Sequence, residues 1–562
     1  MARLTGSPNL DSSAGPVARA VAGALAEALG TEVLPNDMLD FQRATILVVC
    51  AQDVEQTHPV ASTRLKDGVT KNGARLVYVS PRYGELCDFA HSWLQCPPGL
   101  EAATLLRLAQ EVVWQSGPPQ GGEGEAESAE PARSSLPEGL QGVSELLREE
   151  TSGLSAEMEA AIKGAAAPIV EGREQTARGP MAFVLAPPEV DPLSAGAQTR
   201  ALLNLALVSA GPGNGPLWTH LLPHQPNVNG MRDAGVAGER DFNAIIEAIE
   251  AGNVRALVAL RDNPLFSAPG RARTTAALQK LELLVVIDEL LTDTAKMASV
   301  VLPDVSLWGK DGTIVSADRR LMRQNAATSP VDEARPAWWT LSKLGHALAS
   351  RLEQETAGWE FASAAEIMDQ LAEANTLFAE GPYCENSSGI RQPAQHPPQI
   401  RVVPVRMPAV AAQGHQGETL TLMTNRGQFT SYEAAQLHQP NADRLQREVY
   451  ALINPADASR LGGGNLDIVT VRGDDGSLEI PLLVTEQVMA GSIFVPLFYD
   501  GGALMSILSA DPARLVASAA SVLLTGRRAA PPPDPVAVRE PEASGQDVIP
   551  IEQVLAATNP PT

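Results

Sequence analysis

The stretch "ELLTDTAKMASVVLPDVSLWGKDGTIVSADRRLM", Glu289–Met322, carries features that an ordinary buried core segment lacks. A Thr-rich turn follows the end of one apolar run, and a second apolar run stops at Pro303. A charged "GKDGT" loop and paired arginines come next. In open α/β sheets, ligands sit beyond the carboxyl ends of the strands. The stretch therefore predicts the polar edge of an α/β module.

Strands and helices alternate on the amino-terminal side of this stretch. The β-branched runs "TILVVCA" and "ARLVYVS" indicate strands buried on both faces, and "HPVASTRLKDGVTKNG" between them has helical periodicity with Gly73 as its C-cap. The order "VRALVAL", "RTTAALQKL", "ELLVVID" repeats the pattern. A strand–helix–strand unit of this length implies parallel pairing with a right-handed crossover. The sequence thus predicts an α/β fold with two Rossmann-like, doubly wound modules.

The carboxyl-terminal part of the chain has a different pattern. Short apolar runs separated by turn residues follow one another from Thr419 to Gly526: "TLTLMTN", "YALIN", "DIVTVRG", "LEIPLLVT" and "GSIFVPLF". Closely spaced short strands of this kind are typical of a small β-barrel.

Composition excludes several classes of function. The formal net charge is −24, and an acidic surface repels phosphate backbones, so nucleic-acid binding is not expected. No apolar run approaches the roughly 18 residues of a spanning helix, and the N-terminal stretch lacks a signal-peptide core, which favours a cytoplasmic protein. The four cysteines are scattered without a CxxC pair, so we expect no iron–sulphur cluster in this chain.

Familiar catalytic and nucleotide-binding motifs are missing. No GxGxxG follows the first strand, and the sequence contains no GxxxxGK[ST], HExxH or GxSxG motif. His220 and His224 have the spacing of a zinc pair, but Pro223 and Pro226 break a helix there. We therefore predict neither catalytic nor metal-ligating residues.

Several loops, in their order along the chain, resemble those of the molybdopterin oxidoreductases. "QDVEQTHPVASTRLK", "ARLVYVSPRYGELCDFAHSW", "HQPNVNGMRDAGV", "RDNPLFSAPG" and the central stretch are similar to family signatures, and "LTLMTNRG…YALINPADASRLG" resembles the dinucleotide-binding barrel. This family includes formate dehydrogenase catalytic subunits and the large iron–sulphur subunit of bacterial NADH-quinone oxidoreductase (complex I). The resemblance implies a C-terminal double-psi-type β-barrel and a cleft for a doubly phosphorylated pterin dinucleotide.

The resemblance also implies a domain layout and a set of candidate contacts. We expect a remnant helical segment at 1–40 that packs on the second module, a first module at 41–222 with a disordered insertion at 115–139, a second module at 223–384, a linker at 385–418, the barrel at 419–526 and a flexible tail at 527–562. The end of the tail, "VIPIEQVLAATNP", could dock as a short helix on a partner. If a pterin is retained, its contacts would be Gln52, His58, Arg82, Asn263, Thr292, Lys310 and Thr313. The alternative for all seven is that they lie in loops kept from an ancestor and bind no ligand, and we favour that interpretation.

The sequence departs from the family pattern at residues that matter for catalysis. It has no cysteine-rich iron–sulphur region, and the stretch "GTEVLPNDMLDFQRA" before the first strand has no cysteine to ligate a metal. Pro223 stands at the formate-type arginine, Ser80 at an acid that would hold ribose hydroxyls, and Asp318 at a glutamate. An unpaired hydroxyl costs about 1–3 kcal/mol, so several losses together predict weak cofactor binding or none.

These departures favour a non-catalytic structural subunit of an NADH:quinone oxidoreductase, similar to the large iron–sulphur subunit but with a degenerate pterin site. Its partners would be iron–sulphur and flavin subunits of an NADH-oxidising complex, and it would meet the cytoplasmic face of the inner membrane only through that complex. The alternative is a molybdenum or tungsten oxidoreductase of the formate dehydrogenase type, which binds molybdopterin guanine dinucleotide while another chain supplies the iron–sulphur and metal-ligand region. A third hypothesis is an unrelated nucleotide-binding module without bound metal.

Overall fold

The computed structural model describes residues 1–34, 37–116, 141–149, 151, 153–174, 180–210, 218–225, 227–379, 390–391, 401–408, 418–427, 449–473, 475–497, 499–515 and 519–527. Of the insertion predicted at 115–139, residues 117–139 lie outside the described residues, as do most of the predicted linker and all but the first residue of the tail predicted at 527–562.

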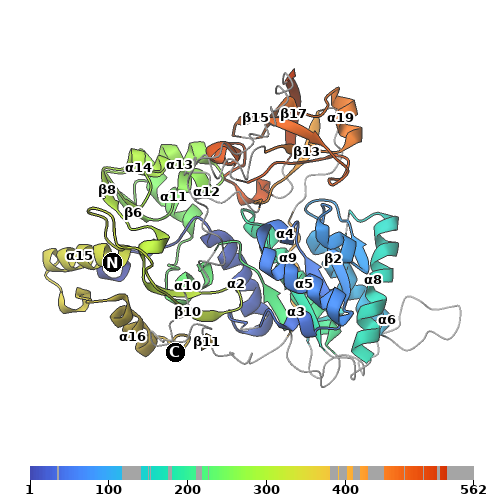
Figure 1. Cartoon of the computed structure of the whole chain (residues 1–562), viewed down its shortest axis with the longest axis horizontal. Coiled ribbons are helices and arrows are strands. Elements are labelled where there is room, and N and C mark those ends of the chain that lie inside the picture. Colours follow the sequence, from blue (N-terminus) through green and yellow to red (C-terminus); the bar gives the residue numbers. More distant parts are fainter. Residues whose placement is uncertain are drawn as a thin grey trace, which may run out of the picture.

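The first module is built on a parallel five-stranded sheet with the order β3-β2-β1-β4-β5. Its strands are β1 (Ile46–Cys50), β2 (Arg75–Val79), β3 (Ser92–Leu94), β4 (Met181–Leu185) and β5 (Trp218–Leu221). The main helices around it are α5 (Pro59–Asn72), α6 (Glu101–Gln115), α8 (Ala156–Glu174) and α9 (Pro192–Ser209) (Figure 1).

Both faces of the central strand β1 are buried, as the unbroken apolar run predicted. Ile46 and Val48 belong to the core that includes side chains of α6, α8 and α9, whereas Leu47 and Val49 pack in the core that includes Leu65 of α5. The intervening helix has the predicted ends, because Pro59 opens α5 and Gly73 closes it with a left-handed φ of 70°. A parallel sheet requires helices on both faces, and this one has them.

The second module has a smaller parallel sheet with the order β6-β7-β8. Its strands are β6 (Ala256–Leu260), β7 (Leu283–Asp288) and β8 (Val300–Pro303), and α11 (Phe242–Glu250), α13 (Arg271–Leu278) and α14 (Asp293–Met297) pack on one face. Three further strands form an antiparallel sheet: β9 (Gly312–Val315), β10 (Arg320–Gln324) and β11 (Ile390–Arg391). The sequence analysis did not predict this antiparallel sheet.

The carboxyl-terminal strands close into a six-stranded barrel with the order β12-β16-β13-β15-β14-β17. They are β12 (Thr419–Met423), β13 (Ala451–Ile453), β14 (Asp467–Arg472), β15 (Ser477–Val484), β16 (Ser492–Phe494) and β17 (Ala519–Arg527). The first strand pairs with the last, and β12–β16 and β13–β15 are parallel pairs. The predicted fold class, α/β modules followed by a β-barrel, is confirmed.

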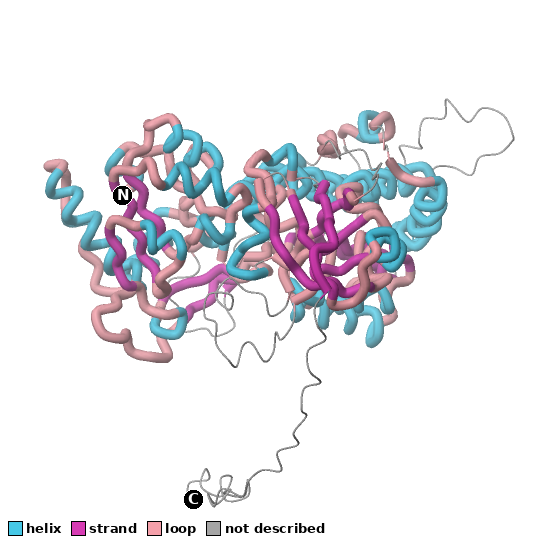
Figure 2. Tube along the Cα trace, turned by 90° about the horizontal axis from the view of Figure 1, so that it is seen from above, coloured by secondary structure: helices cyan, strands magenta, loops and turns pink. Residues whose placement is uncertain are grey.

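Helix α2 (Gly15–Leu29) lies between the two modules (Figure 1). It packs against α9 of the first module and also touches α10 (Val228–Asp233) and α11. Seen from above, the strands form two separate groups with helices between them (Figure 2). The remaining helices are α1 (Ala2–Thr5), α3 (Asp40–Arg43), α4 (Val54–Thr57), α7 (Val143–Leu146), α12 (Pro264–Ser267), α15 (Ala337–Arg351), α16 (Ala364–Ala374) and α19 (Pro455–Leu461).

Candidate functional site

The loops after β1 and β2 meet through the hydroxyl of Ser80 and through the side chain of Arg82. The hydroxyl of Ser80 is completely buried and lies 3.1 Å from the carbonyl oxygen of Gln52 and 2.7 Å from that of Arg82. Ser80, which stands at the position of the family's ribose-binding acid, is therefore hydrogen-bonded to the protein backbone. Gln52 takes part through its main chain.

Arg82 is buried and holds the first module against the barrel. Its guanidinium forms an ion pair with Asp53 and lies 4.1 Å from the ring centroid of Phe494 in β16. Burial lowers the pKa of Arg82 to about 10, which is still well above neutral pH. The next residue, Tyr83, donates its backbone N–H to the carbonyl oxygen of Gln487. The charge of Arg82 is thus neutralised inside the protein.

His58 is part of a pair of neutral imidazoles. Its Nε2 lies 3.0 Å from the carbonyl oxygen of Pro223, its Nδ1 contacts Thr57, and its ring centroid lies 5.1 Å from that of His224. Burial and the neighbouring His224 lower the pKa of His58 to about 3, and burial and Arg426 lower that of His224 to about 3. Both rings are uncharged at neutral pH, so His58 cannot balance a phosphate.

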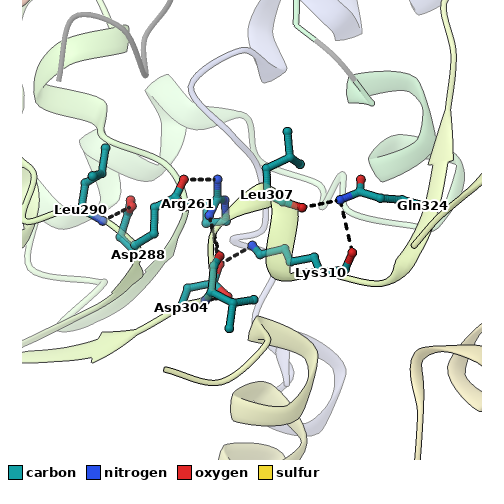
Figure 3. A network of polar contacts seen from close by, with 9 residues as sticks. Arg261, Asp288, Leu290, Asp304, Leu307, Lys310 and Gln324 are labelled. Carbon is teal, nitrogen blue, oxygen red and sulfur yellow. Dashed lines mark hydrogen bonds and ion pairs between the residues drawn. The ribbon is translucent and has the colours of Figure 1, made fainter. Parts of the chain in front are cut away.

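A network of charges fills the carboxyl edge of the second module (Figure 3). Arg261, directly after β6, pairs with Glu289 at 2.8 Å and with Asp304 at 3.3 Å, and Lys310 pairs with the same Asp304. The Asp304 side chain is completely buried. Arg261 adopts a left-handed φ of 47°, a conformation that non-glycine residues rarely take. Burial lowers the pKa of Lys310, although Asp304 opposes the shift.

Two buried polar atoms at this edge have no hydrogen-bond partner within the part of the chain that the structure describes. Asn263 accepts hydrogen bonds from the backbone N–H and hydroxyl of Thr294, but its Nδ2 is unpaired. Asp288, which ends the neighbouring strand β7, accepts from the N–H of Leu290 and leaves Oδ2 unpaired. Unpaired buried polar atoms are rare in native proteins. An amide donor and a carboxylate acceptor are the types of group that hydrogen-bond the edge of a nucleobase.

The other two predicted contacts have local roles. Thr292 is the N-cap of α14, because its hydroxyl accepts the N–H of Ala295 at 3.1 Å. Thr313 lies in β9, opposite Arg323 of β10. The seven predicted residues therefore fall into separate groups: Gln52, His58 and Arg82 in the first module, Asn263, Thr292 and Lys310 at the carboxyl edge of the second, and Thr313 in the antiparallel sheet.

A cavity of about 90 Å³ lies between α2 and the loop after β5. Val17, Ala18, Val21 and Leu25 of α2 form an apolar wall, and His224 and other polar residues line the cavity elsewhere. A second, smaller cavity adjoins the start of α2. None of the seven predicted residues lines either cavity.

The sequence analysis did not predict the ion-pairing role of Asp304 or the contact between Ser13 and Asp262. Asp304 directly follows the apolar run that ends at Pro303, so the carboxyl-end rule could have found it. Ser13 gave no such signal, yet its N–H and hydroxyl both bind the buried Asp262 at 2.8 Å. Within the described residues, no three His, Cys, Asp or Glu side chains are placed to hold a metal ion. No described helix is both long and apolar enough to cross a membrane.

Comparison with family models decides the ancestry. Residues 5–347 match the model described as molybdopterin oxidoreductase, and residues 420–522 match that of the molybdopterin dinucleotide-binding domain. The chain belongs to the molybdopterin oxidoreductase family. This confirms the resemblance inferred from the loop sequences.

Two curated oxidoreductase subunits align with most of this chain. NADPH-Fe(3+) oxidoreductase subunit alpha of Geobacter sulfurreducens is 28% identical over 542 residues, which is 91% of this chain and 60% of the relative. F420-dependent formate dehydrogenase 1 subunit alpha of Methanococcus maripaludis is 23% identical and covers 84% of this chain and 75% of its own. The chain thus spans 60% of the length of the first of these relatives.

The solved structure of acetylene hydratase from Pelobacter acetylenicus has the same fold. It superposes with a TM-score of 0.67 at 17% identity and covers 93% of this chain and 83% of its own. At this identity the likeness shows the fold alone.

The comparisons bear on the predicted cofactor and partners. The dinucleotide-binding match favours a molybdopterin cofactor, so the expectation that none is bound has no support from it. Both relatives are named as alpha subunits, in keeping with a chain that works beside partner subunits.

Proposed function

We propose that this chain is a structural subunit of a multi-subunit oxidoreductase, similar to the large iron–sulphur subunit of NADH-quinone oxidoreductase. It would pack against iron–sulphur and flavin subunits on the cytoplasmic side of the membrane without reacting itself. The observation that carries the proposal is that Arg82, Arg261 and Lys310, three cations in loops at the carboxyl ends of the parallel sheets, are already paired with carboxylates of the same chain.

The pairing matters because a pterin dinucleotide carries two phosphates. Freeing Arg82 would leave Asp53 buried and unpaired, and breaking a buried pair in this way costs about 3–5 kcal/mol. The small size of the cavity beside α2 also argues against a bound dinucleotide. The cavity beside α2 measures about 90 Å³, whereas pockets for drug-sized ligands measure roughly 300–1,000 Å³.

A second candidate is an oxidoreductase chain that binds molybdopterin guanine dinucleotide. The unpaired Nδ2 of Asn263 and Oδ2 of Asp288 favour it, since both would gain partners from a guanine edge. When bound, the group would supply a redox-active molybdenum or tungsten centre. Asn263 and Asp288 would then orient the base, and no other step is assigned to this chain.

Metal and pterin analysis of the chain, purified with its native partner subunits, separates the two candidates. The structural proposal predicts molybdenum and tungsten each below about a tenth of an atom per chain and no pterin fluorescence after acid extraction. About one metal atom per chain would refute it and support the second candidate. Co-purification with flavin and iron–sulphur subunits tests the partners, and their absence from the purified complex would contradict that part of the proposal.

A further inference from the structure

We draw no further inference here: the strongest candidate, the apolar face that strands β6, β7 and β8 of the second module present through Val258, Leu283 and Val300, is uncovered among the residues that the structure describes, and nothing in the structure shows what covers it.

Discussion

Arg82→Met should destabilise the first module, on the side that faces the barrel, by about 3–5 kcal/mol. The side chains of Arg82 and Asp53 are only 9% and 8% exposed, so removal of the cation leaves a buried carboxylate without its partner. Loss of the stacking on Phe494 adds up to about 1 kcal/mol, which is not strictly additive. Methionine fills most of the arginine's volume, so the effect reports charge rather than an empty space.

A double-mutant cycle isolates the charge interaction. Asp53→Asn keeps an oxygen for the N–H of Gln56, the helix-capping bond that Asp53 makes in α4. The double variant should be more stable than Arg82→Met alone, with a coupling free energy of at least about 2 kcal/mol. Urea titration read by hydrogen exchange in peptides from β1, β2 and β16 reports the stability of this contact directly.

The matched control is an ion pair at the surface. Arg255 and Glu282 are 72% and 66% exposed, and Arg255→Ala should change stability by less than about 0.5 kcal/mol. If Arg82→Met costs no more than this control, or if the coupling is below about 0.5 kcal/mol, the argument that Arg82 is unavailable to a phosphate fails.

Three further outcomes are expected. Burial raises the pKa of Glu101 to about 7, so the protein is not destabilised by this group below pH 4.5 and loses stability as the pH rises through 7. Glu101→Gln should therefore raise the free energy of unfolding by about 3 kcal/mol at pH 8 and leave it unchanged at pH 4, as measured by urea unfolding. Burial lowers the pKa of His224 to about 3, so the stability that the neutral imidazole contributes is present above pH 6.5 and is lost as the pH falls toward 3. In the same assay, the stability of His224→Gln should fall less steeply with decreasing pH. Gly270 has a φ of 75°, and a Cβ added there would clash with the Cβ of Ala510, whereas Gly252 has the same φ and open space around it. Gly270→Ala should therefore lower the melting temperature far more than Gly252→Ala. Equal shifts in the two variants would contradict the close contact.

Patterns within short stretches of sequence predicted those strands and helix ends that depend on neighbouring residues. The apolar runs gave β1, β2, β6 and β7, and Gly73 marked the end of α5, because strand burial and helix capping depend on residues near each other in the sequence. Strand β17 was missed because it contains only two β-branched residues, Val522 and Thr525, and ends in Gly526 and Arg527.

Contacts between distant segments were not predictable from these patterns. Arg82 was named as a pterin contact only if a pterin is retained, and the sequence did not indicate that Asp53 would pair with it or that Phe494 would cover it. Asp262 likewise binds Ser13, 249 residues earlier in the chain. Partners of this kind are fixed by tertiary packing, and neither periodicity nor composition records them.

The pairing of the first barrel strand with the last determines when the barrel can finish folding during synthesis. β12 cannot complete its ladder until Ala519–Arg527 has left the ribosome, by which time the residues of both modules have long been available to fold. A transcript with a stop codon before residue 519 would therefore yield two finished modules and a barrel with free strand edges, a template for aggregation.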